Sequence, residues 1–386
     1  MAWSHAYLGG VEAVRWFLFG LVLWLGLNSF TRERLPLLAW GVHLGAFVAS
    51  LWAALQFWVD LSLFPQGPNP ASTFVNRNFY AEFAACTLPF SAMLLARARQ
   101  TAAQAVLAAM LGLVVVAILM TGTRAALIAV WLQALVVLPW LAWRYRRSLP
   151  LGQWAWSHRS VAAGALLLTV VGLGVVPSGN PKILEEGRGA TPIERGLRRT
   201  ASISPGDESL QVRQVMWAAT LRMVRAHPVT GVGAGAWEVQ VPLYQEHGQQ
   251  LETDFYPHNE FLQLLAEDGL VGLVVLLGLF GYLLRSAWVT WRSPADEEGA
   301  WRGVALTSLL ALMVVSNVGF AWRMASTGAL FALCLALLAA SDRRLGLAGG
   351  WAPRALAWTP RRSVAALAAA GACSMLAVSI TVQALE

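Results

Sequence analysis

The sequence predicts an all-α protein that crosses a membrane many times. Of its 386 residues, 57% are hydrophobic and only 13% are charged, and the mean hydropathy is +0.55. A soluble domain cannot bury so large an apolar fraction. Several windows also reach the roughly 20 apolar residues that a helix needs to cross a bilayer. A third observation, the alternation of basic residues between successive connectors, is typical of a polytopic membrane protein.

About ten spans can be placed in the sequence. The first apolar run has neither a basic leader nor a clear cleavage site, so we expect it to be retained as a span. The predicted spans are 11–28, 36–58, 79–96, 102–121, 124–143, 160–177, 270–285, 301–322, 325–340 and 363–382.

The basic residues assign the two faces of the membrane. More than half of the 28 lysines and arginines lie on the connectors after the first, third, fifth, seventh and ninth spans. The positive-inside rule makes that face cytoplasmic. Both chain ends, the 59–78 loop and the long 178–257 loop then lie on the outer face, which is the periplasm of a Gram-negative cell. The high pI of about 9.9 is therefore a topology signal with some attraction to anionic membrane lipids, and we expect no nucleic-acid partner.

This topology divides the chain into three parts. We predict N-terminal transmembrane helices over 1–177, a periplasmic loop over 178–269 and C-terminal transmembrane helices over 270–386.

The periplasmic loop is the only predicted extramembrane region of appreciable length. Its first part, 177–201, is rich in Gly, Pro and Arg and is expected to be irregular. Apolar residues at helical spacing then predict a helix over 207–226. We expect two further short helices, over 237–245 and 258–268, the last leading directly into the seventh span.

Common cofactor motifs are missing from the sequence. It has no P-loop, no zinc-ligand spacing and no Asp-x-Asp pair for a metal-bound nucleotide sugar. The run "GVGAGAW" (231–237) follows a predicted helix, which favours a tight connector over a dinucleotide-binding turn. We therefore expect neither a metal nor a cofactor.

Arg124 opens the fifth span in "TGTRAAL". An arginine near hydrocarbon can extend its charged end to the headgroups, or it can bind a phosphate, because a guanidinium directs two donors at one oxyanion. Its position on the outer face runs against the positive-inside trend and favours the functional interpretation.

A second polar group precedes the third span in "TFVNRNFYAEF" (73–83). Asn76, Arg77 and Asn78 form either a turn in which asparagine caps the helix or a hydrogen-bonding rim for a sugar or a phosphate. Glu82, one turn into the span, needs a partner, for which Arg77 and Arg124 are candidates.

The loop helix carries Arg213, Arg222 and Arg225. These arginines form either a solvated helix face or a surface for an anionic lipid headgroup. Both interpretations remain open for Arg222 and Arg225.

His258 lies where the long loop returns to the membrane, in "DFYPHNEFLQLLAEDGLVG" (254–272). A single histidine on an apolar helix is often structural. Its ordinary pKa also allows it to accept a proton near neutral pH, and Asn259, Glu260 and Glu267 could orient it.

Four of these segments together resemble a known family. "HPVTGVGAGAW" followed by "PHNEFLQLLAEDGLVG" resembles the signature of the O-antigen ligase and polymerase (Wzy-C, WaaL-like) superfamily, and "FVNRNFYAEF" and "TGTRAAL" resemble its two upstream motifs in the right order. The resemblance spans roughly residues 70 to 320. It implies a GT-C-like helical enzyme, with about twelve spans in the ligases, that takes glycan from undecaprenyl diphosphate at the outer face of the bacterial inner membrane. It implies no metal and no nucleotide sugar.

The resemblance also implies residue roles. Arg124 and Arg213 would bind the donor diphosphate, His258 would activate the acceptor hydroxyl, and Asn259 would be its neighbour in the His-Asn pair of the motif. Such a transfer needs a proton acceptor for the hydroxyl and fixed positive charge for the leaving diphosphate.

Several functions share this donor. The leading hypothesis is an O-antigen ligase that transfers glycan to lipid A-core in lipopolysaccharide biosynthesis. The alternatives are a polymerase that extends the glycan on its lipid carrier and an oligosaccharyltransferase that modifies Ser or Thr of a secreted protein. A transporter would place paired broken spans and charges near the membrane midplane. The ionisable residues gather at one face instead, which favours an enzyme.

Overall fold

The computed structural model describes residues 3–61, 63, 66–203, 208–246, 248, 256–347 and 359–385. All regular structure in these ranges is helical, with no strand. Among the described residues, nine helices are long and apolar enough to cross a membrane, which confirms the prediction of an all-α polytopic membrane protein. They are Tyr7–Ser29, Leu35–Trp58, Arg77–Arg97, Thr101–Thr121, Arg124–Tyr145, Trp156–Gly174, Glu260–Arg292, Glu297–Ser316 and Ala325–Arg344.

The tenth predicted span, 363–382, falls inside helix α15 (Pro360–Leu385). The side chains of its C-terminal part lie outside the described residues.

The chain divides into two compact units, each assembled from separate segments. Unit 1 comprises Met1–Ser29, Glu208–Tyr282 and Leu335–Glu386, and unit 2 comprises Phe30–Asp207 and Leu283–Cys334. The division into N-terminal helices, periplasmic loop and C-terminal helices concerns membrane topology and stays a prediction.

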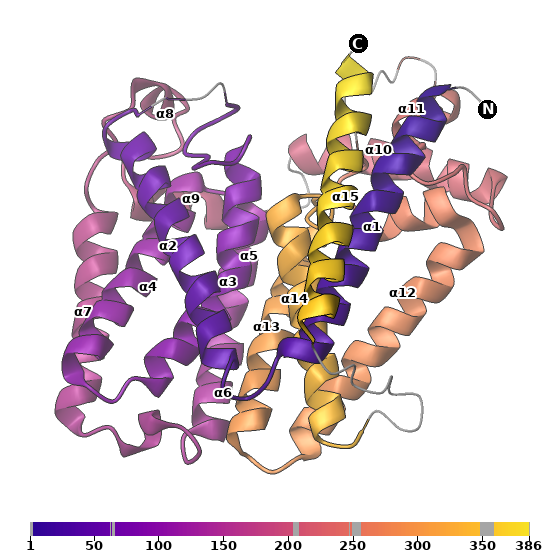
Figure 1. Cartoon of the computed structure of the whole chain (residues 1–386). Helices are drawn as coiled ribbons and strands as arrows, with labels where there is room; N and C mark the ends of the chain where they lie inside the picture. Colours follow the sequence, from indigo (N-terminus) through magenta and orange to yellow (C-terminus); the bar gives the residue numbers. More distant parts are fainter. Residues whose placement is uncertain are drawn as a thin grey trace. The chain divides into compact units, whose positions relative to one another are not determined.

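Unit 2 is a bundle of helices that pack through small residues. Helix α3 lies against α2, α4 and α13, and α4 also packs against α7 (Figure 1). Ala81, Ala84 and Ala85 of α3 are fully buried, and small side chains of this kind let membrane helices approach closely. The helices are α2 (Leu35–Trp58), α3 (Arg77–Arg97), α4 (Thr101–Thr121), α5 (Arg124–Leu132), α6 (Leu138–Tyr145), α7 (Trp156–Gly174) and α13 (Glu297–Ser316).

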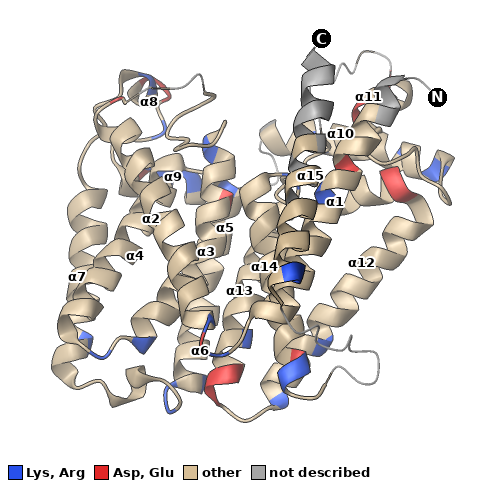
Figure 2. Cartoon of the chain, viewed as in Figure 1, with Lys and Arg blue, Asp and Glu red and all other residues tan. Residues whose placement is uncertain are grey.

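The charges of this bundle gather near the ends of its helices. Long stretches of α2, α4 and α7 carry no Lys, Arg, Asp or Glu (Figure 2). At one end, Arg32 binds the buried carboxylate of Glu298 at 2.9 Å, and Arg97 pairs with Glu297. Apolar middles with paired charges at the ends suit helices that cross hydrocarbon.

The prediction that 177–201 is irregular is wrong, because this segment contains two helices, α8 (Pro181–Glu185) and α9 (Pro192–Ala201). A capping box starts α9. The Thr191 hydroxyl accepts a hydrogen bond from the N–H of Glu194 at 3.2 Å. The Glu194 carboxylate accepts one from the N–H of Ala190, the residue before Thr191, at 2.7 Å. Proline at the first helical position adds to this helix-start signal. The many Gly, Pro and Arg residues of the segment obscured the signal in the sequence.

In unit 1, the three predicted loop helices are present with shifted ends. They are α10 (Glu208–Ala226), α11 (Trp237–Gln240) with a 3₁₀ turn to Tyr244, and the first part of α12 (Glu260–Arg292). Helix α12 kinks at Gly269 and then continues as a span. Helix α1 (Trp3–Ser29) contacts α15 within the same unit.

Candidate active site

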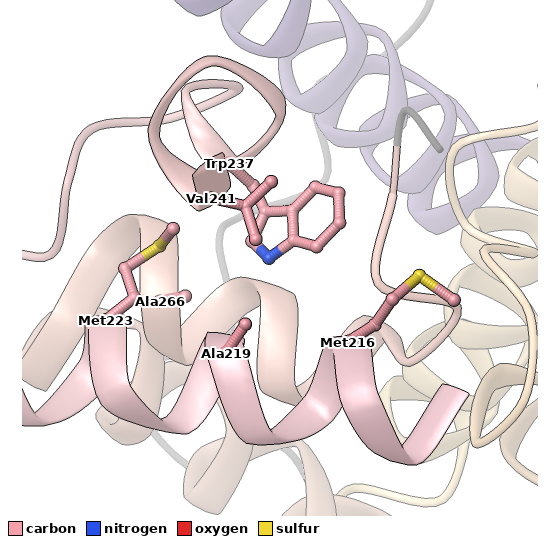
Figure 3. Packing of buried hydrophobic residues seen from close by; sticks show 6 residues of the cluster. All are labelled: Met216, Ala219, Met223, Trp237, Val241 and Ala266. Carbon is pink, nitrogen blue, oxygen red and sulfur yellow. The ribbon is translucent and has the colours of Figure 1, made fainter. Parts of the chain in front are cut away.

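The candidate site residues of unit 1 are supported by a small buried core. Helix α10 contributes its apolar face to this core, and Trp237 donates its indole N–H to the Thr220 hydroxyl at 2.9 Å. The bond satisfies the one polar atom of a fully buried ring. The core joins α10, α11 and the first part of α12 (Figure 3). Its buried members are Met216, Ala219, Met223, Trp237, Val241 and Ala266.

The glycine-rich connector after α10 is joined to α12 by backbone hydrogen bonds. The N–H of Val232 donates to the carbonyl of Ala266 at 2.9 Å, and the N–H of Gly233 donates to the carbonyl of Glu267 at 3.0 Å. These bonds satisfy carbonyls that a helix leaves free where it ends. The two motifs "HPVTGVGAGAW" and "PHNEFLQLLAEDGLVG" are therefore structural partners.

Two glycines make this close approach possible. Gly269 has φ +54°, and a Cβ there would lie 2.6 Å from the Val229 carbonyl oxygen. Gly231 has φ +65°, and a Cβ there would lie 2.2 Å from the Glu267 carbonyl oxygen. Backbone contacts this short leave no room for a side chain, which explains glycine at both positions.

His258 occupies a tight turn immediately before α12. Its φ of +51° is uncommon for a residue other than glycine. Trp217 of α10 fixes the preceding residue by donating its indole N–H to the Pro257 carbonyl at 2.9 Å. Asn259 caps the following helix, because its side-chain oxygen accepts the N–H groups of the second and third residues after it at 3.1 and 3.0 Å. The His258 backbone is thus held from both sides.

Arg213 lies on the side of α10 that faces this turn. It precedes Trp217 by four residues, and positions i and i+4 share one helix face. Trp217 reaches Pro257 from that face. Arg213 is partly buried. Unit 1 therefore brings one predicted arginine to the same side as His258.

The other two arginines of α10 differ in their surroundings. Arg222 donates from Nε to the Tyr244 carbonyl at 2.7 Å and pairs through Nη1 with Glu246 at 3.0 Å. It ties α10 to the turn after α11. Arg225 is exposed. Glu267, considered as an orienting group, accepts a hydrogen bond from Gln263 at 2.8 Å, and both side chains are buried.

In unit 2, the two upstream motifs meet at the corner between α4 and α5. Asn76 caps α3 by accepting the N–H of Asn78 at 3.0 Å. The side-chain oxygen of Asn78 in turn accepts a hydrogen bond from the Thr123 hydroxyl at 2.9 Å. Arg124 follows directly and donates from Nε to the Ser202 hydroxyl at 3.3 Å. The segment 73–83 thus caps α3 through Asn76 and contacts the "TGTRAAL" segment through Asn78.

Arg77 forms an ion pair that the sequence analysis missed. Its Nη1 lies 2.6 and 2.8 Å from the two carboxylate oxygens of Glu186. Glu186 also accepts from the fully buried Arg195 at 2.8 Å. The capping box of α9 was the sequence signal for a folded segment here, but the pairing across about a hundred residues had no local signal.

Glu82 is buried in α3, with 5% of its surface exposed. A Cβ at Gly319, in the connector after α13, would lie 2.8 Å from its Oε1. Its carboxylate is therefore packed against that connector.

The fold and these sites define a multi-pass helical membrane protein in which Arg124, His258 and Asn259 lie at or next to the ends of helices. The four sequence motifs pair two by two, one pair in each unit. A family model described as O-antigen ligase (Wzy-C) matches residues 85–277, half of the chain. The protein belongs to this family, and membership implies a membrane glycosyltransferase that uses lipid-linked glycan. No curated protein matches the chain significantly.

The matched range contains Arg124, Arg213 and His258. The motif at 73–83 lies just before it. The resemblance between the sequence motifs and the superfamily is thereby confirmed at the level of the family.

Proposed function

We propose that this protein is an O-antigen ligase of the bacterial inner membrane. It transfers glycan from undecaprenyl diphosphate to a hydroxyl of lipid A-core on the periplasmic face, without a metal ion or another cofactor. The family match supports the reaction class, and the predicted topology supports the face.

The proposed chemistry assigns one step to each residue. The bond between the anomeric carbon and the diphosphate oxygen breaks, and the leaving diphosphate keeps the electron pair. Arg124 and Arg213 bind that diphosphate and stabilise its growing charge. The acceptor oxygen forms the new bond to the anomeric carbon, and its proton passes to His258.

The observation that carries the proposal is the way His258 is held. Backbone in the left-handed region costs about 1–3 kcal/mol for a residue other than glycine and is concentrated at functional sites. The Trp217–Pro257 bond and the Asn259 cap fix that turn beside the face of α10 that bears Arg213. A backbone turn held in this way supports His258 as the proton acceptor, and Arg213 on the face of α10 that bears Trp217 supports a role in binding the anionic leaving group.

The test is a reconstituted transfer reaction. Purified protein in proteoliposomes receives lipid-linked glycan and lipid A-core, and a lipopolysaccharide ladder is read on a gel. His258→Ala is expected to lower the rate by at least ~100-fold, since general acid–base catalysis contributes about 10²–10⁴-fold. His227→Ala is the matched control, because that exposed histidine lies in the same unit and hydrogen-bonds Tyr244 at 2.9 Å.

Other products would redirect the assignment. Longer lipid-linked glycan without a ladder would identify a polymerase, and glycan on an added protein would identify an oligosaccharyltransferase. Transport of lipid-linked glycan across the bilayer without any transfer product would favour the transporter. A full ladder with His258→Ala at equal protein amount would remove His258 from the chemistry.

A further inference from the structure

Arg195 of α9 has its guanidinium fully engaged inside unit 2. The side chain has no exposed surface. Its Nε donates to the Met120 carbonyl at 2.8 Å, its Nη1 to the Ile183 carbonyl at 3.2 Å, and its Nη2 to the Glu186 carboxylate at 2.8 Å. One side chain therefore joins the end of α4, helix α8 and the residue that follows α8.

Glu186 extends this network to the start of α3. Its two oxygens receive Arg77 at 2.6 and 2.8 Å, and one of them also receives Arg195. Partial burial raises the pKa of Glu186, but the hydrogen bonds and charges of Arg195 and Arg77 outweigh burial and leave its pKa below the ordinary value. The carboxylate is thus charged at neutral pH. Removing the charge of Glu186 would leave the buried guanidinium groups of Arg77 and Arg195 uncompensated.

Helix α9 also holds the corner between α4 and α5 directly. Arg199 donates from Nε to the Gly122 carbonyl at 3.2 Å, two residues before Arg124. Further bonds run from the Arg124 guanidinium to Ser202 at 3.3 Å and from the Trp131 indole to Thr200 at 3.0 Å. The corner that presents Arg124 and the start of α5 are therefore bound by the last residues of α9 and by Ser202, which follows it.

We infer that Arg195, Glu186 and Arg77 form a positioning network that fixes Arg124 for diphosphate binding. The network fixes the position of α9, and α9 is hydrogen-bonded to the corner that bears Arg124. Arg195 is itself unsuited to bind substrate, because it is buried and each of its nitrogens already donates a hydrogen bond. This inference rests on the proposed function, and it adds residues that act through Arg124 without touching the substrate. Functional groups need such support to keep their geometry.

A double-mutant cycle on ligand binding tests the network. The full-length protein is placed in lipid nanodiscs, and its Kd for undecaprenyl diphosphate is measured for wild type, Glu186→Gln, Arg124→Ala and the double variant. We expect Arg124→Ala and Glu186→Gln each to raise Kd by about tenfold, the lower end for a charge-assisted hydrogen bond. In the Arg124→Ala background, Glu186→Gln should raise Kd less than twofold, because coupled residues are not additive.

Two further variants separate positioning from loss of fold. Arg195→Lys keeps the charge, but the lysine cannot reach the three acceptors, so this variant should raise Kd. In the Arg124→Ala background, Arg195→Lys should raise Kd much less, as Glu186→Gln does. Arg198→Gln is the matched control on α9, because its side chain is 60% exposed, and it should change Kd less than twofold. Thermal midpoints are recorded for every variant.

The outcomes distinguish this inference from the function on which it rests. An unchanged Kd for Glu186→Gln, or the same fold-change with and without Arg124, would overturn the positioning role and leave the proposed function standing. Failure of the wild-type protein to bind undecaprenyl diphosphate would overturn the proposed donor, and the inference with it.

Discussion

Replacing Asn259 by alanine tests whether this residue acts through the backbone or on the substrate. Its side-chain oxygen accepts two N–H groups of the first turn of α12, from Phe261 at 3.1 Å and from Leu262 at 3.0 Å. Loss of an asparagine cap costs about 1 kcal/mol. Since ~1.4 kcal/mol is a factor of ten, the first turn should open about five times more often.

Hydrogen exchange measures this opening directly. Peptides that cover 256–268 should exchange about fivefold faster in Asn259→Ala than in wild type, when exchange follows the opening equilibrium. Asn259→Asp is the matched control, because aspartate caps as well as asparagine and its charge suits a helix N-terminus. We expect Asn259→Asp to keep both the protection and most of the transfer activity, and Asn259→Ala to reduce both.

Two results would refute this reasoning. Unchanged exchange in Asn259→Ala would mean that the cap does not stabilise the turn. Normal exchange together with lost activity in Asn259→Asp would mean that the amide N–H₂ group, which aspartate lacks, acts on the substrate.

Two other predictions concern stability. Gly269→Ala should destabilise unit 1 by more than ~1 kcal/mol, because alanine is strained at positive φ and its Cβ would meet backbone atoms at 2.6 Å. Gly278→Ala, on the same helix with no atom within 4 Å of its Cβ, should be neutral or stabilising, and thermal unfolding in detergent compares the two. Because the pKa of Glu186 is lowered in the folded protein, its contribution to the free energy of unfolding is complete above the ordinary carboxyl pKa. That contribution is lost as the pH falls through the folded-state pKa. The thermal midpoint of the wild-type protein should therefore decrease when the pH is lowered below about 4.5. The midpoint of Glu186→Gln should decrease less over the same pH range, and an equal decrease in both proteins would contradict this role.

Hydropathy and periodicity were sufficient for most of the fold. An apolar run of about 20 residues has few alternatives to a transmembrane helix, because every backbone polar group in lipid must be bonded within its own segment. The loop helices over 207–226 and 258–268 were also predictable, since an amphipathic helix has a regular period. The helix at 192–201 was missed because the glycines and prolines around it dominated the local composition, although its capping box was present.

The candidate site could be predicted only in part. Arg124 and His258 were noticed because a charge or a titratable group beside an apolar helix is costly and therefore informative. Arg213 was singled out by the resemblance to the family. Their roles remain proposals. Arg195 and Glu186 could not be found in this way, because an ion pair between distant segments has no local pattern.

The sequence by itself determined that this protein is a polytopic helical membrane protein of the O-antigen ligase family, because composition, period and short motifs are local properties of the chain. The tertiary structure decided which motifs are partners. It paired the glycine-rich connector with the part of α12 next to the Gly269 kink, in the motif that begins with His258, and it paired the start of α3 with the corner that holds Arg124. Such pairings depend on close backbone approach and on hydrogen bonds between segments far apart in sequence, and these exist only once the chain has packed.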